Sequence, residues 1–444
     1  MSTGGVKAAV SSMSSKPDRT DTGRGTQVPL AKFSKVDRQT YPDAPRSSGN
    51  IPATYENFRH LLTEAGISVR FNLVAKRPEI TIPGLSLERQ NRDAVVLAHL
   101  ESLLIRNEMS TGQATQYLLA LADQNAFDPV ADWITSKPWD GTSRLATTCG
   151  TIVPQEGYPI AFRDVLIRKW LLSIVAATFR RPGFRARGVL TLQGAQGLGK
   201  TSWVARLVTP QALRDEVVKL GHSWDGGSKD ARLTALRHRI VELGELEGSF
   251  RKDMASLKAF ITDENDKIRP PYDRVEAEYP RNTIFAASVN DPQFLLDNTG
   301  NSRFWTIPAA QIDHAHNIDM QQVFAELKVA YDAGAQWWLT QAEEQELAAI
   351  NYQHRVVSAI EAKIGEALDL TRLARTDLPR LTAIQVLHRL GIEKPTNPQA
   401  KEANVALRNL LGDSKRSGGF NRWRVPFRQE NPSAGVYTDD EDEY

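Results

Sequence analysis

The feature that most constrains the fold is the stretch GAQGLGKT at 194–201. It satisfies the pattern GxxxxGK[ST], and the apolar run GVLTL at 188–192 leads directly into it. A strand, a glycine-rich turn and a helix in this order form a P-loop, in which backbone N–H groups converge on nucleotide phosphates. The stretch therefore predicts a nucleotide site in an α/β fold. The alternative is a glycine-rich strand-to-helix turn that holds no ligand.

The residue types in this stretch indicate how a nucleotide and a metal ion would be held. Lys200 is expected to reach the β and γ phosphate oxygens, and the Thr201 hydroxyl to hold Mg²⁺. ATP and Mg²⁺ are therefore the expected cofactors. The predicted nucleotide contacts are Gly194, Ala195, Gln196, Gly197, Leu198, Gly199, Lys200, Thr201 and Ser202.

Two later apolar runs, RIVEL at 239–243 and NTIFAASVN at 282–290, have the composition of buried strands. Because helical patterns separate these runs, they predict a mainly parallel sheet between helices. Phosphoryl transfer also needs carboxylates, a polar group near the γ-phosphate and an arginine. The candidates are Glu242, assigned to the metal, Glu245, assigned to the attacking water, Asn290 and Arg303, with a surface salt bridge as the alternative for the arginine.

Composition and patterning divide the 444 residues unevenly. The net charge is only +2, so contact with nucleic acid must come from local basic clusters, and the single cysteine, Cys149, excludes an internal disulfide framework. The expected segments are a disordered 1–50, a mostly helical module at 51–150, a P-loop ATPase core at 151–335, a helical connector at 336–378, a basic winged-helix-like domain at 379–430, and an acidic disordered tail at 431–444.

Two basic segments are candidates for holding DNA. The stretch KIRPPYDR at 267–274 places Lys267, Arg269 and Arg274 around Tyr272, which suits phosphates beside a stacked base. The C-terminal segment reads as helix, helix and glycine-turned hairpin, with Asn397 as the expected N-cap of the second helix. Its basic residues crowd around Trp423, and the predicted DNA contacts there are Arg422 and Arg424; an ordinary basic domain is the alternative.

Several motifs occur along the chain in this order: FDPVADWITSKPWDGTSRL, the P-loop, VELGEL, LKAFITDENDKIRPPYDR, the strand ending in Asn290, and TGNSRFWTI. In this order the chain resembles the virulence-associated protein E family of phage and prophage proteins, which is similar to superfamily 3 helicases with an AAA+-like core. The resemblance covers 55–345. It implies that 194–201 is the Walker A motif, that Glu242 and Glu245 form the Walker B region, and that 269–274 is a DNA-contacting hairpin. It further implies that Asn290 is the sensor and Arg303 the arginine of the TGN-x-R-F-W motif.

These observations favour an ATP-dependent DNA helicase or translocase for replication of a phage or mobile element. Its expected partners are single-stranded or forked DNA, further copies of the chain in a ring such as a hexamer, and replication proteins. No membrane contact is expected, and the expected location is the cytoplasm of a bacterial host. The alternative from another class is a nucleotide-switched DNA-binding initiator or defence-type protein that unwinds little. His314 and His316 are interpreted as surface histidines.

Overall fold

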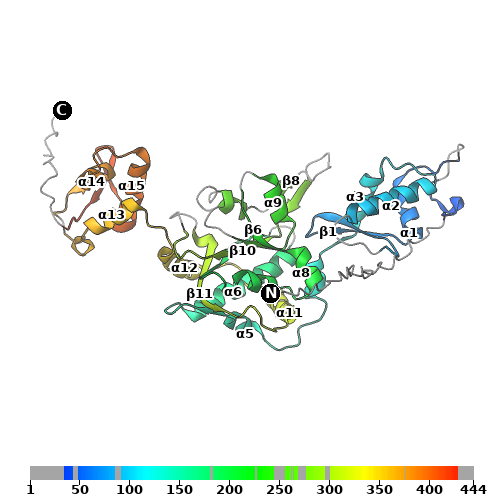
Figure 1. Cartoon of the computed structure of the whole chain (residues 1–444), viewed down its shortest axis with the longest axis horizontal. Helices are drawn as coiled ribbons and strands as arrows, with labels where there is room; N and C mark the ends of the chain where they lie inside the picture. The colour runs from blue at the N-terminus through cyan, green and yellow to red at the C-terminus, as the bar shows by residue number, and fades with distance from the viewer. Residues whose placement is uncertain are drawn as a thin grey trace, which may run out of the picture. The chain divides into compact units, whose positions relative to one another are not determined.

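The computed structural model of the chain describes residues 35–43, 49–85, 92–180, 184–225, 228–244, 256–261, 263, 265–268, 277–295, 301–375 and 377–428. The chain divides into two compact units, Met1–Asp128 and Pro129–Tyr444 (Figure 1). The first unit therefore ends before the predicted domain boundary at 150. The predicted disordered segment 1–50 and the acidic tail 431–444 lie almost wholly outside the described residues.

The first unit combines a small sheet with helices. Strand β1 pairs antiparallel with β2 and parallel with β3, in the order β2-β1-β3. The described elements are η1 (Arg38–Thr40), α1 (Tyr55–Glu64), β1 (Ser68–Asn72), β2 (Arg77–Thr81), α2 (Arg92–Arg106), α3 (Ala114–Gln124) and β3 (Ala126–Phe127). Helix α1 has an apolar face, and Phe58, Leu61 and Leu62 on that face are buried in the core of this unit.

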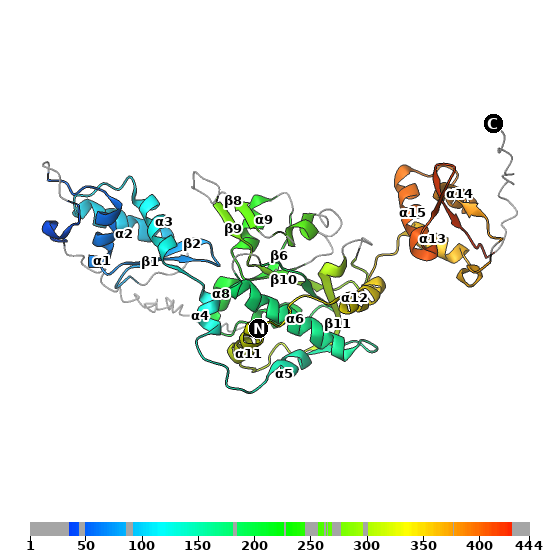
Figure 2. The same cartoon turned by 180° about the vertical axis from the view of Figure 1, so that it is seen from behind.

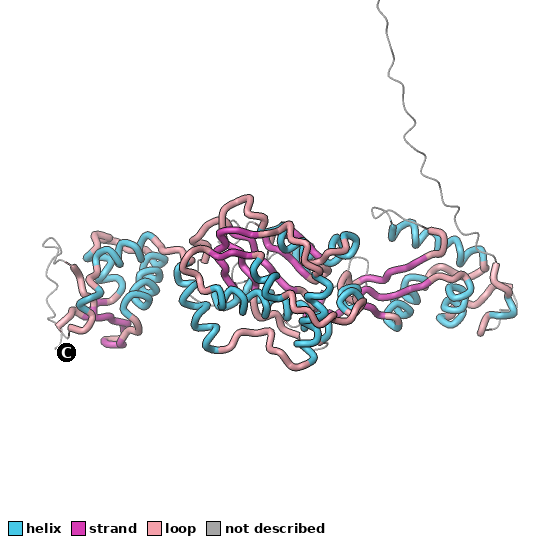
Figure 3. Tube along the Cα trace, turned by 90° about the horizontal axis from the view of Figure 1, so that it is seen from below, coloured by secondary structure: helices cyan, strands magenta, loops and turns pink. Residues whose placement is uncertain are grey.

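The second unit is built on a six-stranded sheet of order β4-β11-β5-β10-β7-β6. All neighbouring strands are parallel except β4, which runs antiparallel to β11. The predicted mainly parallel sheet is confirmed, and Figure 3 shows its strands in magenta. The strands are β4 (Ile152–Pro154), β5 (Val189–Gln193), β6 (Val218–His222), β7 (Ile240–Leu243), β10 (Ile284–Val289) and β11 (Phe304–Ile312).

The sheet is held by a long buried helix, α6 (Ile160–Phe179), which packs against β5, β10 and α11 (Figures 1 and 2). Trp170 is fully buried and its Nε1 donates to the Phe285 carbonyl oxygen at 2.8 Å. Arg163 lies within this helix, close to its N-terminus. The further helices are α4 (Pro129–Ile134), α5 (Leu145–Gly150), α7 (Lys200–Arg206), α8 (Gln211–Val217), α9 (Lys229–Leu236), α11 (Met320–Asp332) and α12 (Gln341–Gln353).

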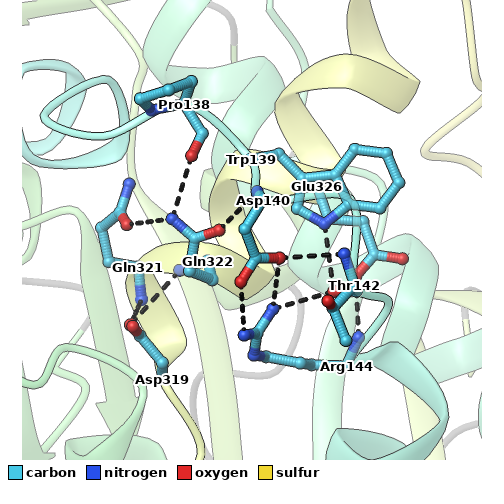
Figure 4. Close-up of polar contacts among 9 residues, drawn as sticks. All are labelled: Pro138, Trp139, Asp140, Thr142, Arg144, Asp319, Gln321, Gln322 and Glu326. Atoms are coloured by element: carbon cyan, nitrogen blue, oxygen red, sulfur yellow. Dashed lines mark hydrogen bonds and ion pairs between the residues drawn. The ribbon is translucent and has the colours of Figure 1, made fainter.

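The turn-rich stretch 137–145 is anchored on α11 within the second unit (Figure 4). Gln322 accepts from the Asp140 backbone N–H at 2.8 Å and donates to Pro138, while Glu326 accepts from the Arg144 backbone N–H at 3.0 Å. The Arg144 guanidinium also pairs with the Asp140 side chain and holds the pKa of that carboxyl below its usual range. Hydrogen bonds to the backbone and an ion pair between side chains therefore hold this stretch in place.

The C-terminal part folds around its own apolar cluster, which includes Ile364, Leu387, Leu407 and Trp423. The elements follow in the order α13 (Ala359–Ala367), η4 (Leu370–Arg372), β12 (Arg380–Leu381), α14 (Ala383–Arg389), α15 (Asn397–Leu411), β13 (Lys415–Ser417) and β14 (Phe420–Arg424). The three strands form a sheet of order β12-β14-β13. Helix, helix and hairpin are present as predicted, and α13, which the sequence placed in the connector, belongs to the same cluster.

Two expectations for this part are wrong. The N-cap of α15 is Thr396, whose hydroxyl accepts from the Gln399 backbone N–H in a capping box, and Asn397 is the first helical residue. The Gln399 side-chain Oε1 completes the capping box by accepting from the Thr396 backbone N–H. An N-cap at Asn397 would not form this box. Trp423 is 2% exposed and its Nε1 donates to the Gly412 carbonyl oxygen, so it belongs to the core and not to a binding surface.

The capping box generates a prediction for α15. Thr396→Ala removes the hydroxyl that caps the helix, and an N-cap of this kind contributes about 1 kcal/mol. Hydrogen exchange of the first-turn amides of α15 is expected to rise about fivefold. Asn397→Ala is the matched control and should leave the exchange unchanged. A larger effect at Asn397 than at Thr396 would contradict this assignment of the cap.

Candidate nucleotide site at the end of β5

The glycine-rich loop, residues 194–199, joins the end of β5 to the start of α7. Gly197 and Gly199 both have φ of +86°, a left-handed conformation that glycine adopts without steric cost. The loop is tied to the sheet, since the Gly194 N–H donates to the Val289 carbonyl oxygen at 3.0 Å. The predicted strand, loop and helix therefore follow one another as the sequence pattern requires.

Lys200 is the first residue of α7 and is only 7% exposed. Its Nζ donates to the carbonyl oxygens of Gly194 at 2.8 Å and Ala195 at 2.9 Å, and to Asn290 Oδ1 at 2.9 Å. Asn290 directly follows β10, the strand next to β5 in the sheet. The ammonium group is thus held at the loop by backbone carbonyls on one side and by the end of a neighbouring strand on the other.

Glu242 lies on β7, the next strand along, and is completely buried. Its Oε1 accepts from the Thr201 hydroxyl at 3.1 Å, and its Oε2 accepts from the Gly221 backbone N–H at 2.7 Å. A hydroxyl and a carboxylate at this separation are the hard oxygen ligands that Mg²⁺ uses in proteins. The donor set of Thr201 and Glu242 therefore fits a magnesium ion.

Three predicted site residues thus converge because they follow neighbouring parallel strands in the order β5-β10-β7. Lys200, Asn290 and Glu242 come from segments far apart in sequence, and the carboxyl ends of parallel strands meet at one edge of a sheet. Ligands of open α/β sheets bind in the crevice outside that edge. Among the loop residues, Ala195, Gln196 and Gly197 are exposed, as are Thr201 and Ser202 at the start of α7.

Arg303 lies at the opposite end of the sheet from the glycine-rich loop. It ends η3 (Asn301–Arg303), and the next residue, Phe304, pairs with Val189 at the start of β5. The loop follows the other end of β5, about 13 Å further along the strand. Arg303 is half-buried, and its Nε has no hydrogen-bond partner among the described residues. The structure therefore does not bring Arg303 to the loop of its own chain.

The remaining predicted residues are only partly covered by the structure. Strands β8 (Asn265–Ile268) and β9 (Ala277–Pro280) pair antiparallel, with Lys267 opposite Glu278. These strands bracket the predicted DNA-contacting segment. The side chain of Lys267 and the residues Glu245, Arg269, Tyr272 and Arg274 lie outside what the structure describes.

Sequence reasoning missed the role of His314, which follows β11. Its imidazole ring lies against the glycine-rich loop: a Cβ added to Gly199 would lie 2.3 Å from His314 Nδ1 and 3.1 Å from His314 Cβ. The only sequence signal is that His314 comes directly after an apolar strand. His316 was expected at the surface, but it is 6% exposed, and this burial lowers the pKa of its imidazole. Among the described residues, no group of three or more histidine, cysteine, aspartate or glutamate side chains could hold a metal ion.

The contact with His314 generates a prediction with a matched control. Gly199→Ala and Gly197→Ala both place a side chain at φ +86°, which costs about 1–2 kcal/mol in each case. Only Gly199→Ala also meets His314, because nothing lies within 4 Å of a Cβ added at Gly197. The free energy of unfolding in urea should therefore fall further for Gly199→Ala, by an additional ~1–3 kcal/mol.

Rotation of the His314 side chain would move its ring atoms away, but the His314 Cβ would still lie 3.1 Å from the added Cβ. Adding His314→Ala to Gly199→Ala should bring the stability back to that of Gly197→Ala. Equal losses in all three variants would show that the ring does not press on the loop.

Comparisons with known proteins give the following matches. The family model described as the virulence-associated protein E-like domain matches residues 134–356, about half of the chain. Two solved structures of the NrS-1 C-terminal region match with TM-scores of 0.37 and 0.38 at 16% and 13% sequence identity. Each of these matches covers 83% of this chain and 98% of the matched NrS-1 chain. No curated protein matches. None of the helices in the described part of the chain is long and apolar enough to span a membrane.

Proposed function

This chain belongs to the virulence-associated protein E-like family, and we propose that it hydrolyses ATP to move DNA, as a helicase or translocase in the replication of a phage or mobile element. The observation that carries the proposal is the convergence of Lys200, Asn290, Thr201 and Glu242 at one edge of the sheet. Phosphoryl transfer to water requires such groups around a nucleotide: a positive charge, an amide, a hydroxyl and a carboxylate.

Each residue of the site takes a chemical role that follows from its position. The backbone N–H groups of the glycine-rich loop and the first turn of α7 bind the phosphates, and Lys200 stabilises the charge that develops on the β and γ oxygens. Thr201 and Glu242 would hold Mg²⁺, which would supply positive charge to offset the negative charge of the phosphates. Asn290 orients the γ-phosphate or the attacking water through its side-chain amide. Glu245, the other acidic candidate, is assigned to polarise that water.

Arg303 is assigned to a neighbouring copy of the chain. Because it lies at the far end of β5 from its own loop, it completes a site only by reaching the nucleotide of an adjacent protomer. An arginine supplied in this way stabilises the transition-state charge, and a head-to-tail contact that closes produces a ring. A homo-oligomeric ring, such as a hexamer, is therefore the proposed assembly.

DNA is assigned to the segment between β8 and β9. These strands pair antiparallel, and the predicted DNA-contacting stretch 267–274 begins in β8 and precedes β9 in the sequence. After β9 the chain continues into β10, and Asn290 directly follows that strand. A change in the contacts of Asn290 with the γ-phosphate would therefore reach the DNA-holding segment through β10 and β9.

The first test is Lys200→Ala. Loss of a charge that stabilises the transition state costs about 10²- to 10³-fold in rate, so ATP turnover in the presence of single-stranded DNA should fall by that factor. Lys363→Ala, an exposed lysine on α13, is the control and should retain turnover. Undiminished hydrolysis by the Lys200 variant would overturn the nucleotide assignment.

The same assay distinguishes a motor from a switch in the unmodified protein. Many ATP molecules hydrolysed per protein, with unwinding of a forked duplex, support the helicase or translocase. Slow turnover combined with nucleotide-dependent assembly on DNA would instead support the initiator-type alternative.

The second test concerns Arg303→Ala. This variant should bind ATP but lose turnover, because the arginine acts on a neighbour's nucleotide. Mixed in equal amounts with Lys200→Ala protein, it should recover activity, since about a quarter of the interfaces then pair an intact Lys200 with an intact Arg303. Size-exclusion chromatography should show that the two proteins co-assemble. A mixture that co-assembles but remains inactive would contradict action across the interface.

A further inference from the structure

The C-terminal sheet has one buried face and one exposed face, and the strand register sorts its side chains between them. On the buried face, Leu381 of β12 pairs with Trp423 of β14, and both belong to the apolar cluster. Alternate residues of a strand point to opposite faces, so Phe420, Arg422 and Arg424 share the other face. Directly opposite them lie Ser417, Lys415 and Arg380, respectively.

Two of these cross-strand pairs join like charges. Arg424 stands opposite Arg380, and Arg422 stands opposite Lys415. Like charges in directly opposed positions destabilise a sheet. Among the described residues, no ion pair relieves them: the nearby Asp377 carboxylate is already paired with Arg375. The arrangement therefore costs stability in the isolated chain and is favoured when an anion lies on this face.

An exposed aromatic ring lies on the same face. Phe420 is 64% exposed and follows the two-residue turn of Gly418 and Gly419, both of which have positive φ. Such a turn closes a tight hairpin and places Phe420 at its tip. Basic side chains beside an exposed aromatic ring are typical of surfaces that hold single-stranded nucleic acid, with phosphates on the charges and a base stacked on the ring.

The neighbouring helix α15 is a poorer candidate. Its exposed residues Lys401 and Arg408 are interspersed with Glu402 and Val405, so it offers charges of both signs and an apolar side chain. In helix–turn–helix proteins the second helix enters the major groove of duplex DNA. Here the uniform positive charge lies on the sheet and not on the helix.

We propose that the exposed face of the β12-β14-β13 sheet binds single-stranded DNA, with Arg380, Lys415, Arg422 and Arg424 on the phosphates and Phe420 against a base. This inference rests on the proposed function only in taking DNA as the substrate. It adds Arg380, Lys415 and Phe420 to the contacts predicted for this segment, Arg422 and Arg424.

The test measures binding of full-length protein to a fluorescent oligo-dT without ATP, across a salt series. The variant Arg380→Gln/Lys415→Gln/Arg424→Gln removes three phosphate contacts, so the log–log salt slope should become shallower by about 2. Phe420→Ala should weaken binding about 5- to 150-fold while leaving the slope unchanged, because stacking does not depend on counterion release. The control Lys401→Gln/Arg408→Gln removes two charges from α15 and should leave both readouts unchanged.

The substituted side chains of the triple variant are exposed, so its thermal midpoint should match or exceed that of the unmodified protein. An unchanged slope and affinity in that variant would overturn the proposal. A loss in the α15 control, or tighter binding of a duplex of equal length that is insensitive to Phe420→Ala, would overturn it as well. Since ATP is absent, failure of ATP hydrolysis leaves this readout intact, and the two proposals fail separately.

Discussion

The hydrogen bonds from Lys200 to Asn290 and from Thr201 to Glu242 join the start of α7 to the ends of two neighbouring strands. Because both contacts are made by the first turn of one helix, the position of that helix determines the geometry of the whole candidate site. The second oxygen of Glu242 is held by the Gly221 backbone N–H, which extends the connection to β6. The site therefore depends on the parallel order of β5, β10, β7 and β6.

Strand polarity has a second consequence at the other end of the sheet. The direction of β5 that delivers the glycine-rich loop to one edge also leaves Arg303 at the opposite edge. In the proposed ring, this arginine is assigned to the nucleotide of an adjacent protomer. In that arrangement, catalysis requires assembly, because each site is incomplete without its neighbour.

The C-terminal sheet obeys a comparable constraint. Burying Leu381 and Trp423 against α13, α14 and α15 forces the alternate residues of the strands outward. The apolar contact that stabilises this part therefore gathers its arginines and lysine on one face. Side chains of α11 likewise hold the stretch that precedes α5, so segments 182 residues apart in the sequence are joined in the second unit.

Local pattern was sufficient for much of this protein. The strand GVLTL, the glycine-rich loop and the placement of Glu242 and Asn290 at strand ends were predictable because strand periodicity and the need for glycine act over a few residues. Only the tertiary structure decided that Trp423 is buried, that His314 presses on Gly199 and that Arg303 lies at the far end of β5. These outcomes depend on which strands pair and in which direction. Pairings between residues distant in sequence are governed by the packing of the whole core, which no short stretch of sequence specifies.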